Sequence, residues 1–207
     1  MKSLCFDNLI ARYPTLAICE NDIQKAYNVI KNCFNAENRL YICGNGGSAA
    51  DALHIVGELV KSFMLKRSLD SDFIKNVDRQ LSSNLQGALP AFALVENSAL
   101  TSAFSNDCNP DYIYAQQVYA YMRKNDCLLG ISTSGNSENV INAIHAAKGR
   151  GATTIGLTGN SGGEMKEICD VCICVPETET YKIQELHLPV YHAICEALEE
   201  HFWGGNH

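Results

Sequence analysis

The feature that most constrains the fold is a junction that occurs twice, in which a short apolar run ends in a turn of small polar residues and a helical pattern begins. Residues 40–43 lead into GNGGS at 44–48, and residues 127–131 lead into STSGNS at 132–137. Such a junction joins a buried parallel strand to the helix that crosses back over the sheet. The sequence therefore predicts an α/β fold with a doubly wound sheet.

The rest of the chain repeats this alternation. Strands are expected at 40–43, 91–95, 127–131, 153–157 and 171–175, and helices at about 15–36, 49–64, 98–104, 112–123, 138–148 and 180–202, with a shorter helix before Pro14. The polar stretch 66–86 has no period, which predicts a long loop or a lid. No internal repeat or linker divides the chain, so a single domain over 1–207 is expected, with N-terminal helices at about 1–37 and an α/β core at about 38–207.

Charge and cysteine content bear on partners and compartment. The net charge of −7, with no basic stripe, argues against a nucleic-acid partner. The ten cysteines accompany no apolar leader and no apolar run near the ~20 residues of a membrane span. A cytoplasmic protein with no membrane partner and with reduced, buried cysteines is therefore expected. Cys169, Cys172 and Cys174 have no second pair at zinc-ribbon spacing, and alternation as in a strand is favoured.

Both turns suit a phosphate group. Unpaired N–H groups and a positive dipole at a helix N-terminus attract anions, and small residues allow close approach to the backbone. Four hydroxyls between Ser132 and Ser137 exceed the one that a helix cap needs. The 44–48 turn carries a weaker signal, because glycine-rich strand-to-helix turns are common in α/β proteins. It matches neither a dinucleotide fingerprint nor a Walker loop.

A second pattern suggests a metal. His54 and Glu58 are four residues apart on one expected helix, and Gln184 and His192 are eight apart on another, so each pair shares a helix face. Two imidazoles, a carboxylate and an amide oxygen suit a divalent ion such as zinc. Each residue alone is more typical of an ordinary helix surface or a hydrogen-bonded histidine.

Two further points concern that pattern. Gln184 and His192 lie ~12 Å apart along a straight helix, so one ion binds both only if the side chains converge or the helix bends. Pro189 lies between them and favours a kink. The remaining histidines are taken as structural, with His187 the best substitute ligand; they are His145, His187, His201 and His207.

Taken in order, these motifs resemble the phosphoheptose isomerases of the sugar-isomerase (SIS) domain superfamily. The resemblance rests on CGNGGSAADAxHxxxEL at 43–59, Asn106-Asp107, GISTSGNS at 130–137, and IQExH at 183–187 with His192. It implies a flavodoxin-like αβα sandwich with a five-stranded parallel sheet, and a homotetramer with active sites between subunits. It also implies conversion of sedoheptulose 7-phosphate to D-glycero-D-manno-heptose 7-phosphate, the entry to bacterial heptose synthesis.

The resemblance also implies roles for individual residues. Glu58 and His192 become an acid–base pair, and the zinc ligands become His54, Glu58, Gln184 and His192. The expected substrate contacts are Asn45, Gly46, Gly47, Ser48, Glu58, Asn106, Asp107, Ser132, Thr133, Ser134, Ser137 and Gln184. A related regulator branch loses some of the four zinc ligands, and all four are present here.

The expected chemistry is aldose–ketose interconversion through an enediol. It needs a base at carbon, an acid at oxygen and stabilisation of the developing oxyanion. Two alternatives stay open: an isomerase of another ketose phosphate, and a non-catalytic SIS protein that senses a sugar phosphate. The long 66–86 stretch and residues 95–98, VENS, depart from the usual family pattern near the expected substrate mouth.

Overall fold

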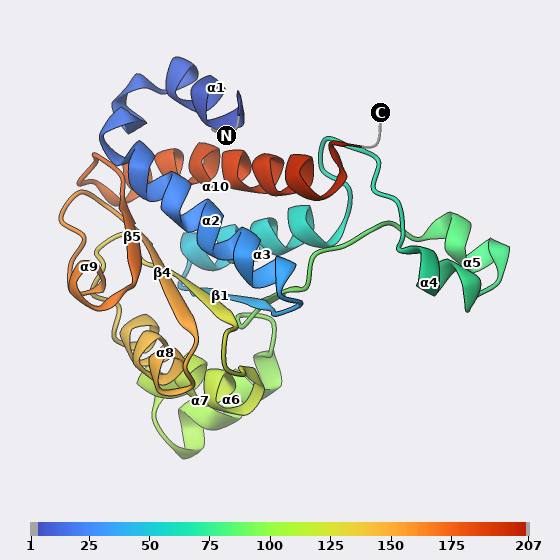
Figure 1. The fold of residues 1–207 in the computed structure, drawn as a ribbon. Helices are drawn as coiled ribbons and strands as arrows, with labels where there is room; N and C mark the ends of the chain where they lie inside the picture. Colours follow the sequence, from blue (N-terminus) through green and yellow to red (C-terminus); the bar gives the residue numbers. More distant parts are fainter. Residues whose placement is uncertain (1–3, 206–207) are drawn as a thin grey trace.

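The computed structural model describes residues 4–205, and within them five parallel strands form one sheet (Figure 1). Its order is β2-β1-β3-β4-β5. The strands are β1 (Leu40–Gly44), β2 (Ala91–Ala93), β3 (Cys127–Ile131), β4 (Thr153–Thr158) and β5 (Val171–Cys174). The central strands β1 and β3 are buried at every position, as expected for strands covered on both faces.

Helices cover both faces of this sheet. One layer contains α1 (Leu4–Arg12), α2 (Glu20–Asn35), α3 (Gly47–Val60) and α10 (Thr180–Trp203). The other contains α7 (Ile113–Tyr121), α8 (Glu138–Gly149) and the short α9 (Met165–Ile168), with α6 (Ser98–Asp107) packed beside α7. The flavodoxin-like αβα sandwich expected from the sequence is confirmed.

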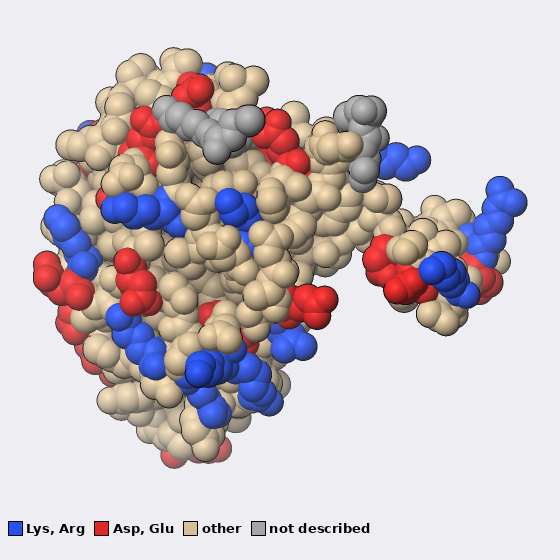
Figure 2. Space-filling model, in the orientation of Figure 1, with Lys and Arg blue, Asp and Glu red and all other residues tan. Residues whose placement is uncertain are grey.

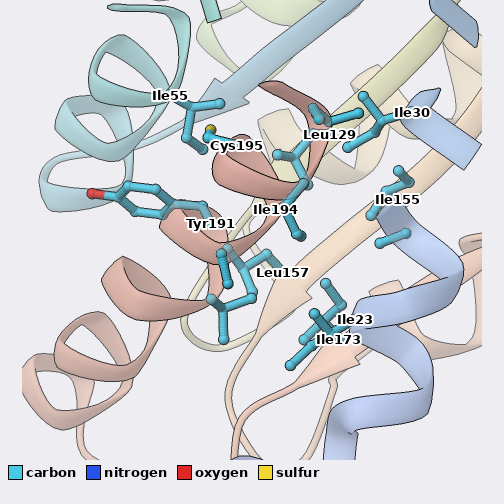
Figure 3. Close-up of a cluster of buried hydrophobic side chains, with 14 of the residues drawn as sticks. Ile23, Ile30, Ile55, Leu129, Ile155, Leu157, Ile173, Tyr191, Ile194 and Cys195 are labelled. Carbon is cyan, nitrogen blue, oxygen red and sulfur yellow. The ribbon is translucent and has the colours of Figure 1, made fainter. Parts of the chain in front are cut away.

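Each layer has its own hydrophobic core. In the first, side chains from α2, α3 and α10 meet the sheet, and Figure 3 shows Ile23, Leu157 and Ile194 converging there. Tyr191 belongs to the same cluster, but its hydroxyl points away from the other labelled side chains (Figure 3). The second core lies under α7 and α8 and includes Val118 and Ile144, both fully buried.

Several element boundaries differ from the sequence prediction. The expected helix from about 15 begins as a 3₁₀ turn, Pro14–Cys19, before α2 starts at Glu20. Helix α3 starts two residues earlier than expected and ends at Val60 instead of 64, because Lys61 is extended. The four-residue helix α9 was not expected, since it is too short to give a periodic signal.

The stretch 66–86 forms an arm that projects from the body of the molecule (Figures 1 and 2). It carries two short helices, α4 (Ser71–Lys75) and α5 (Arg79–Asn84), neither of which has a buried residue. Asp70 and Asp78 begin them by accepting N–H bonds from the first turn, as N-caps do. The arm closes at its base, where the Gly87 N–H donates to the Arg67 carbonyl at 3.2 Å.

No disulfide joins the ten cysteines, all of which lie in the described part of the chain. Six are buried, as expected, namely Cys5, Cys19, Cys33, Cys43, Cys127 and Cys195. Cys108 is exposed, and Cys169, Cys172 and Cys174 are half-buried, so the expectation of burial is wrong for these four. None of the helices in residues 4–205 combines the length and hydropathy needed to cross a membrane.

Candidate active site

The two polar turns lie side by side at the carboxyl ends of neighbouring strands. Gly44, the last residue of β1, pairs in register with Ile131, the last residue of β3. The strand order reverses between β1 and β3, which is where open α/β sheets bind their ligands. Both turns continue into helices, α3 and α8, whose N-termini therefore face the same space.

The first turn is held open by its neighbours. Gly46 has φ +55°, a left-handed conformation that glycine adopts without strain. The Asn45 amide donates to Asn139 Oδ1 at 2.8 Å, and the Asn139 amide donates back to Asn45 Oδ1 at 3.0 Å. The Tyr114 hydroxyl donates to the Gly44 carbonyl at 2.6 Å. The reciprocal amide pair fixes the first turn to the start of α8, so the two turns form one unit.

The second turn gathers its hydroxyl groups. Ser132 Oγ lies 2.8 Å from Ser137 Oγ and 3.4 Å from Ser134 Oγ. Ser137 is the N-cap of α8, yet its side chain makes no capping hydrogen bond. The hydroxyls therefore contact one another and do not cap the first turn of α8. This leaves them able to donate hydrogen bonds to an anion.

His54, Glu58 and His192 come together from α3 and α10. His54 Nε2 lies 3.2 Å from Glu58 Oε1 and 3.4 Å from His192 Nε2. The other carboxylate oxygen of Glu58 accepts from Lys61 Nζ at 2.9 Å. Burial, and to a lesser degree the nearby His54, lower the pKa of His192, which favours its neutral imidazole.

These donors fit a divalent metal ion. In a tetrahedral zinc site, ligand atoms ~2.0–2.1 Å from the metal lie ~3.3 Å from one another. Both separations around His54 Nε2, 3.2 Å and 3.4 Å, are close to that value. Across residues 4–205, no three His, Cys, Asp or Glu side chains already enclose a metal position. The donors are thus brought together in pairs around His54.

The opposite side of the His54 ring has partners that the sequence analysis did not identify. Its Nδ1 lies 3.0 Å from the Tyr191 hydroxyl, which donates to Asp51 Oδ1 at 3.2 Å. Burial raises the pKa of Asp51, although the Tyr191 hydrogen bond and His54 oppose it. A chain of this kind orients a metal-ligating imidazole. The available signals were the three-residue spacing from Asp51 to His54 and the adjacency of Tyr191 to His192.

Gln184 lies elsewhere in the site. Its amide packs on Gly47, where a Cβ atom would collide with Gln184 Nε2. Helix α10 continues through Pro189 without a break, so Gln184 contacts the first turn while His192 contacts His54. Asn106 and Asp107 lie exposed at the end of α6, joined to each other at 2.8 Å. The structure therefore brings His54, Glu58 and His192 together, while Gln184 packs on the first turn.

A buried ion pair lies next to the backbone of Glu58 at the C-terminal end of α3. Arg67 donates from Nε to Glu199 Oε1 at 2.6 Å, and its other nitrogens donate to the carbonyls of Leu59 and Glu58, each at 2.7 Å. Both charged side chains are fully buried. Although burial opposes it, three backbone N–H bonds and the Arg67 contact hold the pKa of Glu199 below its ordinary value. The guanidinium thus caps the carbonyl end of α3 beside Glu58.

The other histidines take no part in this cluster. His187 is fully buried, and neither ring nitrogen has a well-formed partner among the described residues. Burial lowers the pKa of His187 to about 4, opposed only by the backbone at Thr158. His145 and His201 are exposed on other surfaces, and His207 lies outside the described residues.

Known proteins share this arrangement of sequence and fold. Residues 15–89 and 84–159 match the family model described as SIS domain. A phosphoheptose isomerase of Rhodospirillum rubrum is 40% identical over 185 residues, which cover 89% of this chain and 88% of the relative. Another, from a Nitratiruptor species, is 44% identical over 167 residues, covering 80% and 79%. The solved structure of the phosphoheptose isomerase of Neisseria gonorrhoeae gives a TM-score of 0.76 at 33% identity, covering 94% of this chain and 95% of that one.

Proposed function

This chain belongs to the SIS domain family, and on that premise we propose that it is a phosphosugar isomerase converting sedoheptulose 7-phosphate to D-glycero-D-manno-heptose 7-phosphate. Relatives and a solved structure that cover most of the chain carry the name phosphoheptose isomerase. Two observations support the proposal. Two turns of small polar residues lie side by side at the ends of β1 and β3, and His54, Glu58 and His192 meet between α3, which leaves the first turn, and α10.

The phosphate is assigned to the turn 132–137. Its grouped hydroxyls and the N-terminus of α8 supply neutral donors and a positive dipole, which suits an anion on a protein of net charge −7. The sugar then extends toward the first turn, where Asn45, Ser48 and Gln184 offer polar groups to its hydroxyls. Asn106 and Asp107 are assigned to the same substrate from the end of α6.

Glu58 and His192 are assigned the proton transfers. Glu58 takes the proton from C1 of the ketose and returns it to C2, while His192 moves a proton between the O1 and O2 oxygens of the enediol. The neutral form of His192, favoured by its lowered pKa, can accept a proton at neutral pH. The carboxylate of Glu58 is held between His54 and Lys61, so its orientation toward substrate is fixed from both sides.

Zinc is the proposed cofactor, with one ion per subunit. His54, Glu58 and His192 would hold it, and Gln184 would join them if its side chain left Gly47. A bound zinc ion supplies Lewis-acid polarisation of a carbonyl group. We further place the protein in the cytoplasm, in heptose biosynthesis, as a homotetramer whose active sites lie between subunits. Size-exclusion chromatography with light scattering tests the tetramer.

A panel of ketose phosphates of five to seven carbons tests the substrate. Each is incubated with the zinc-loaded protein, and aldose formation is followed by NMR. The proposal expects sedoheptulose 7-phosphate to give the highest kcat/KM. Preference for a shorter ketose would keep the isomerase and change the sugar. Tight binding of every phosphate without turnover would instead indicate a non-catalytic sensor.

A further inference from the structure

Three cysteine sulfur atoms gather behind the second turn, on the side away from the proposed metal ligands. Cys172 Sγ and Cys174 Sγ on β5 lie 3.9 Å apart. A Cβ atom at Gly156 on β4 would lie 2.9 Å from Cys172 Sγ and 3.2 Å from Cys169 Sγ, so these two sulfurs cover the same glycine. All three side chains are half-buried, and within residues 4–205 β5 is an edge strand of the sheet, paired with β4. The proposed isomerisation uses none of them.

The two thiols on β5 differ in chemistry because they share a hydrogen bond. That bond, helped by Lys166 and opposed by burial, lowers the pKa of Cys174 to about 7. The same bond, together with burial, raises the pKa of Cys172. The Lys166 side chain and Cys174 Sγ both pack on Gly162, whereas Cys172 Sγ packs on Gly156, so the lysine charge favours a thiolate at Cys174. Since a thiolate is the attacking species in exchange reactions, Cys174 is assigned as the nucleophile and Cys172 as the neighbour that can resolve an adduct. By contrast, burial raises the pKa of Cys43 to about 12.

Contacts connect this thiol pair to the second turn. Cys174 Sγ lies 3.1 Å from the position of a Cβ atom at Gly162, which has φ +76°. The Gly162 carbonyl in turn packs directly on Gly135 of the turn. The Met165 N–H donates to the Gly135 carbonyl at 3.1 Å, and the Glu164 N–H donates to Asn136 Oδ1 at 2.9 Å. Cys174 therefore contacts a segment, residues 162–165, that packs against the turn 132–137; we call this segment the rear wall of the turn.

We propose that Cys172 and Cys174 form a thiol–disulfide exchange site for small-molecule disulfides of the glutathione type, and that its oxidation displaces the rear wall of the turn 132–137. The Cys174 thiolate attacks one sulfur of the external disulfide, forming a mixed disulfide and releasing one thiolate. The Cys172 thiol then loses its proton and attacks Cys174 Sγ, releasing the second. Two protein thiols are oxidised, and one external disulfide is reduced to two thiols.

Geometry predicts that closure moves β5. Residues two apart on a strand have Cα atoms about 6.6 Å apart, near the upper limit of about 6.8 Å for a disulfide. The sulfur atoms must approach from 3.9 Å, so the edge strand bends locally and Cys174 moves relative to Gly162. The resulting bond is strained and easily reduced, as expected of a reversible modification.

The first experiment maps the disulfide. Full-length protein is incubated with oxidised glutathione, quenched with acid, alkylated and digested for mass spectrometry. The wild type is expected to lose two hydrogen atoms from the peptide that contains Cys172 and Cys174. Cys172→Ser should retain one glutathione on Cys174, and Cys174→Ser should leave Cys172 unmodified. Cys108→Ser, which removes the exposed thiol, is the matched control and should behave as wild type. Reaction of the wild type at Cys108 alone, or equal reaction of Cys174→Ser, overturns the proposal.

The second experiment measures the link to the turn, which rests on the proposed function. Binding of inorganic phosphate is compared for reduced, oxidised and re-reduced protein by calorimetry. Oxidation is expected to weaken phosphate binding by roughly tenfold, the effect of losing one hydrogen bond to a charged group, and dithiothreitol should restore it. Unchanged affinity in a protein with the mapped disulfide refutes the link. Absence of phosphate binding in the reduced protein would count against the proposed function. The exchange site would still be tested independently by the mass-spectrometric mapping of the disulfide.

Discussion

At the scale of single residues, the site depends on what holds His54. One ring nitrogen faces Glu58 and His192, and the other faces the hydroxyl of Tyr191, itself bonded to Asp51. The orientation of the His54 ring is therefore set by the hydroxyl of Tyr191. Burial raises the pKa of Tyr191, so this hydroxyl stays uncharged. Removing that hydroxyl should change the orientation of His54, the proposed metal ligand, and leave the core packing of the Tyr191 ring in place.

Tyr191→Phe is therefore expected to weaken zinc binding by about 10- to 100-fold, the usual effect of losing a hydrogen-bond partner of a metal-ligating histidine. Competition with a fluorescent zinc chelator measures the affinity directly. Tyr41→Phe is the control, because the hydroxyl of the buried Tyr41 also donates one hydrogen bond, to the Tyr121 carbonyl, away from the site. Equal affinities in the two variants would contradict the role of Tyr191.

His187 should make the fold sensitive to acid. Its pKa is about 4 in the folded protein, against an ordinary value of 6.5. Between these values the unfolded chain binds a proton that the folded chain does not, so stability falls as pH falls from 6.5 toward 4. The loss is limited to about 3 kcal/mol.

Urea denaturation of the metal-free protein at pH 7, 6, 5 and 4.5 measures this dependence. His187→Gln should show a shallower fall in the free energy of unfolding than the wild type. Some fall should remain, because His192 and His201 also have lowered pKa values. Identical slopes would show that His187 is not the neutral buried group described here.

At the scale of elements, the arm and the body have unequal roles in stability. Helices α4 and α5 bury no residue, whereas Arg67 at the arm's base forms a buried ion pair with Glu199 of α10. The backbone hydrogen bond from Gly87 to Arg67 joins the two ends of the arm. The base thus belongs to the body, and the helical tip is an addition to it.

Replacing residues 70–84 by a short glycine linker should therefore change the melting temperature by no more than about 2 °C. Arg67→Met provides the contrast, because it leaves the Glu199 carboxylate buried and unpaired and should cost about 3–5 kcal/mol. Differential scanning calorimetry of both variants measures the difference. A large loss from the tip deletion alone would mean that the tip stabilises the protein, for instance across a subunit contact.

The turn 132–137 depends on a glycine at position 135. Gly135 has φ +69°, and a Cβ atom there would collide with the Gly162 carbonyl. Gly135→Ala should destabilise the protein by at least ~1 kcal/mol and abolish tight phosphate binding. Gly57→Ala is the matched control, since open space surrounds that helical position and alanine there should stabilise by about 0.5–1 kcal/mol. Equal stability of the two variants would contradict this account of the turn.

Sequence patterns predicted some elements better than others, for physical reasons. The bounds of β3 were predicted correctly because a wholly buried strand is a continuous apolar run. Helices α4 and α5 were missed because helices without a buried face have no apolar period. In the site, the four-residue spacing of His54 and Glu58 did predict a contact, since neighbouring turns of one helix fix it.

At the scale of the whole molecule, contacts between distant segments were harder to predict. The approach of His192 to His54 and of Gln184 to Gly47 depends on how α10 packs over α3, which no local pattern encodes. The arrangement places two turns of small polar residues at one end of a single sheet, and the cluster of His54, Glu58 and His192 between α3 and α10. The gathering of these polar side chains, in a fold whose two cores are apolar, is the basis for assigning isomerase activity.

The most direct test of that assignment is the rate of aldose formation from sedoheptulose 7-phosphate by zinc-loaded wild type and Glu58→Gln, with folding of both checked by circular dichroism. We expect the wild type to produce the heptose 7-phosphate and Glu58→Gln to lose at least ~100-fold in kcat, the lower range for a missing general base. Turnover of Glu58→Gln at the wild-type rate, or no aldose from the folded wild type, would contradict the assignment.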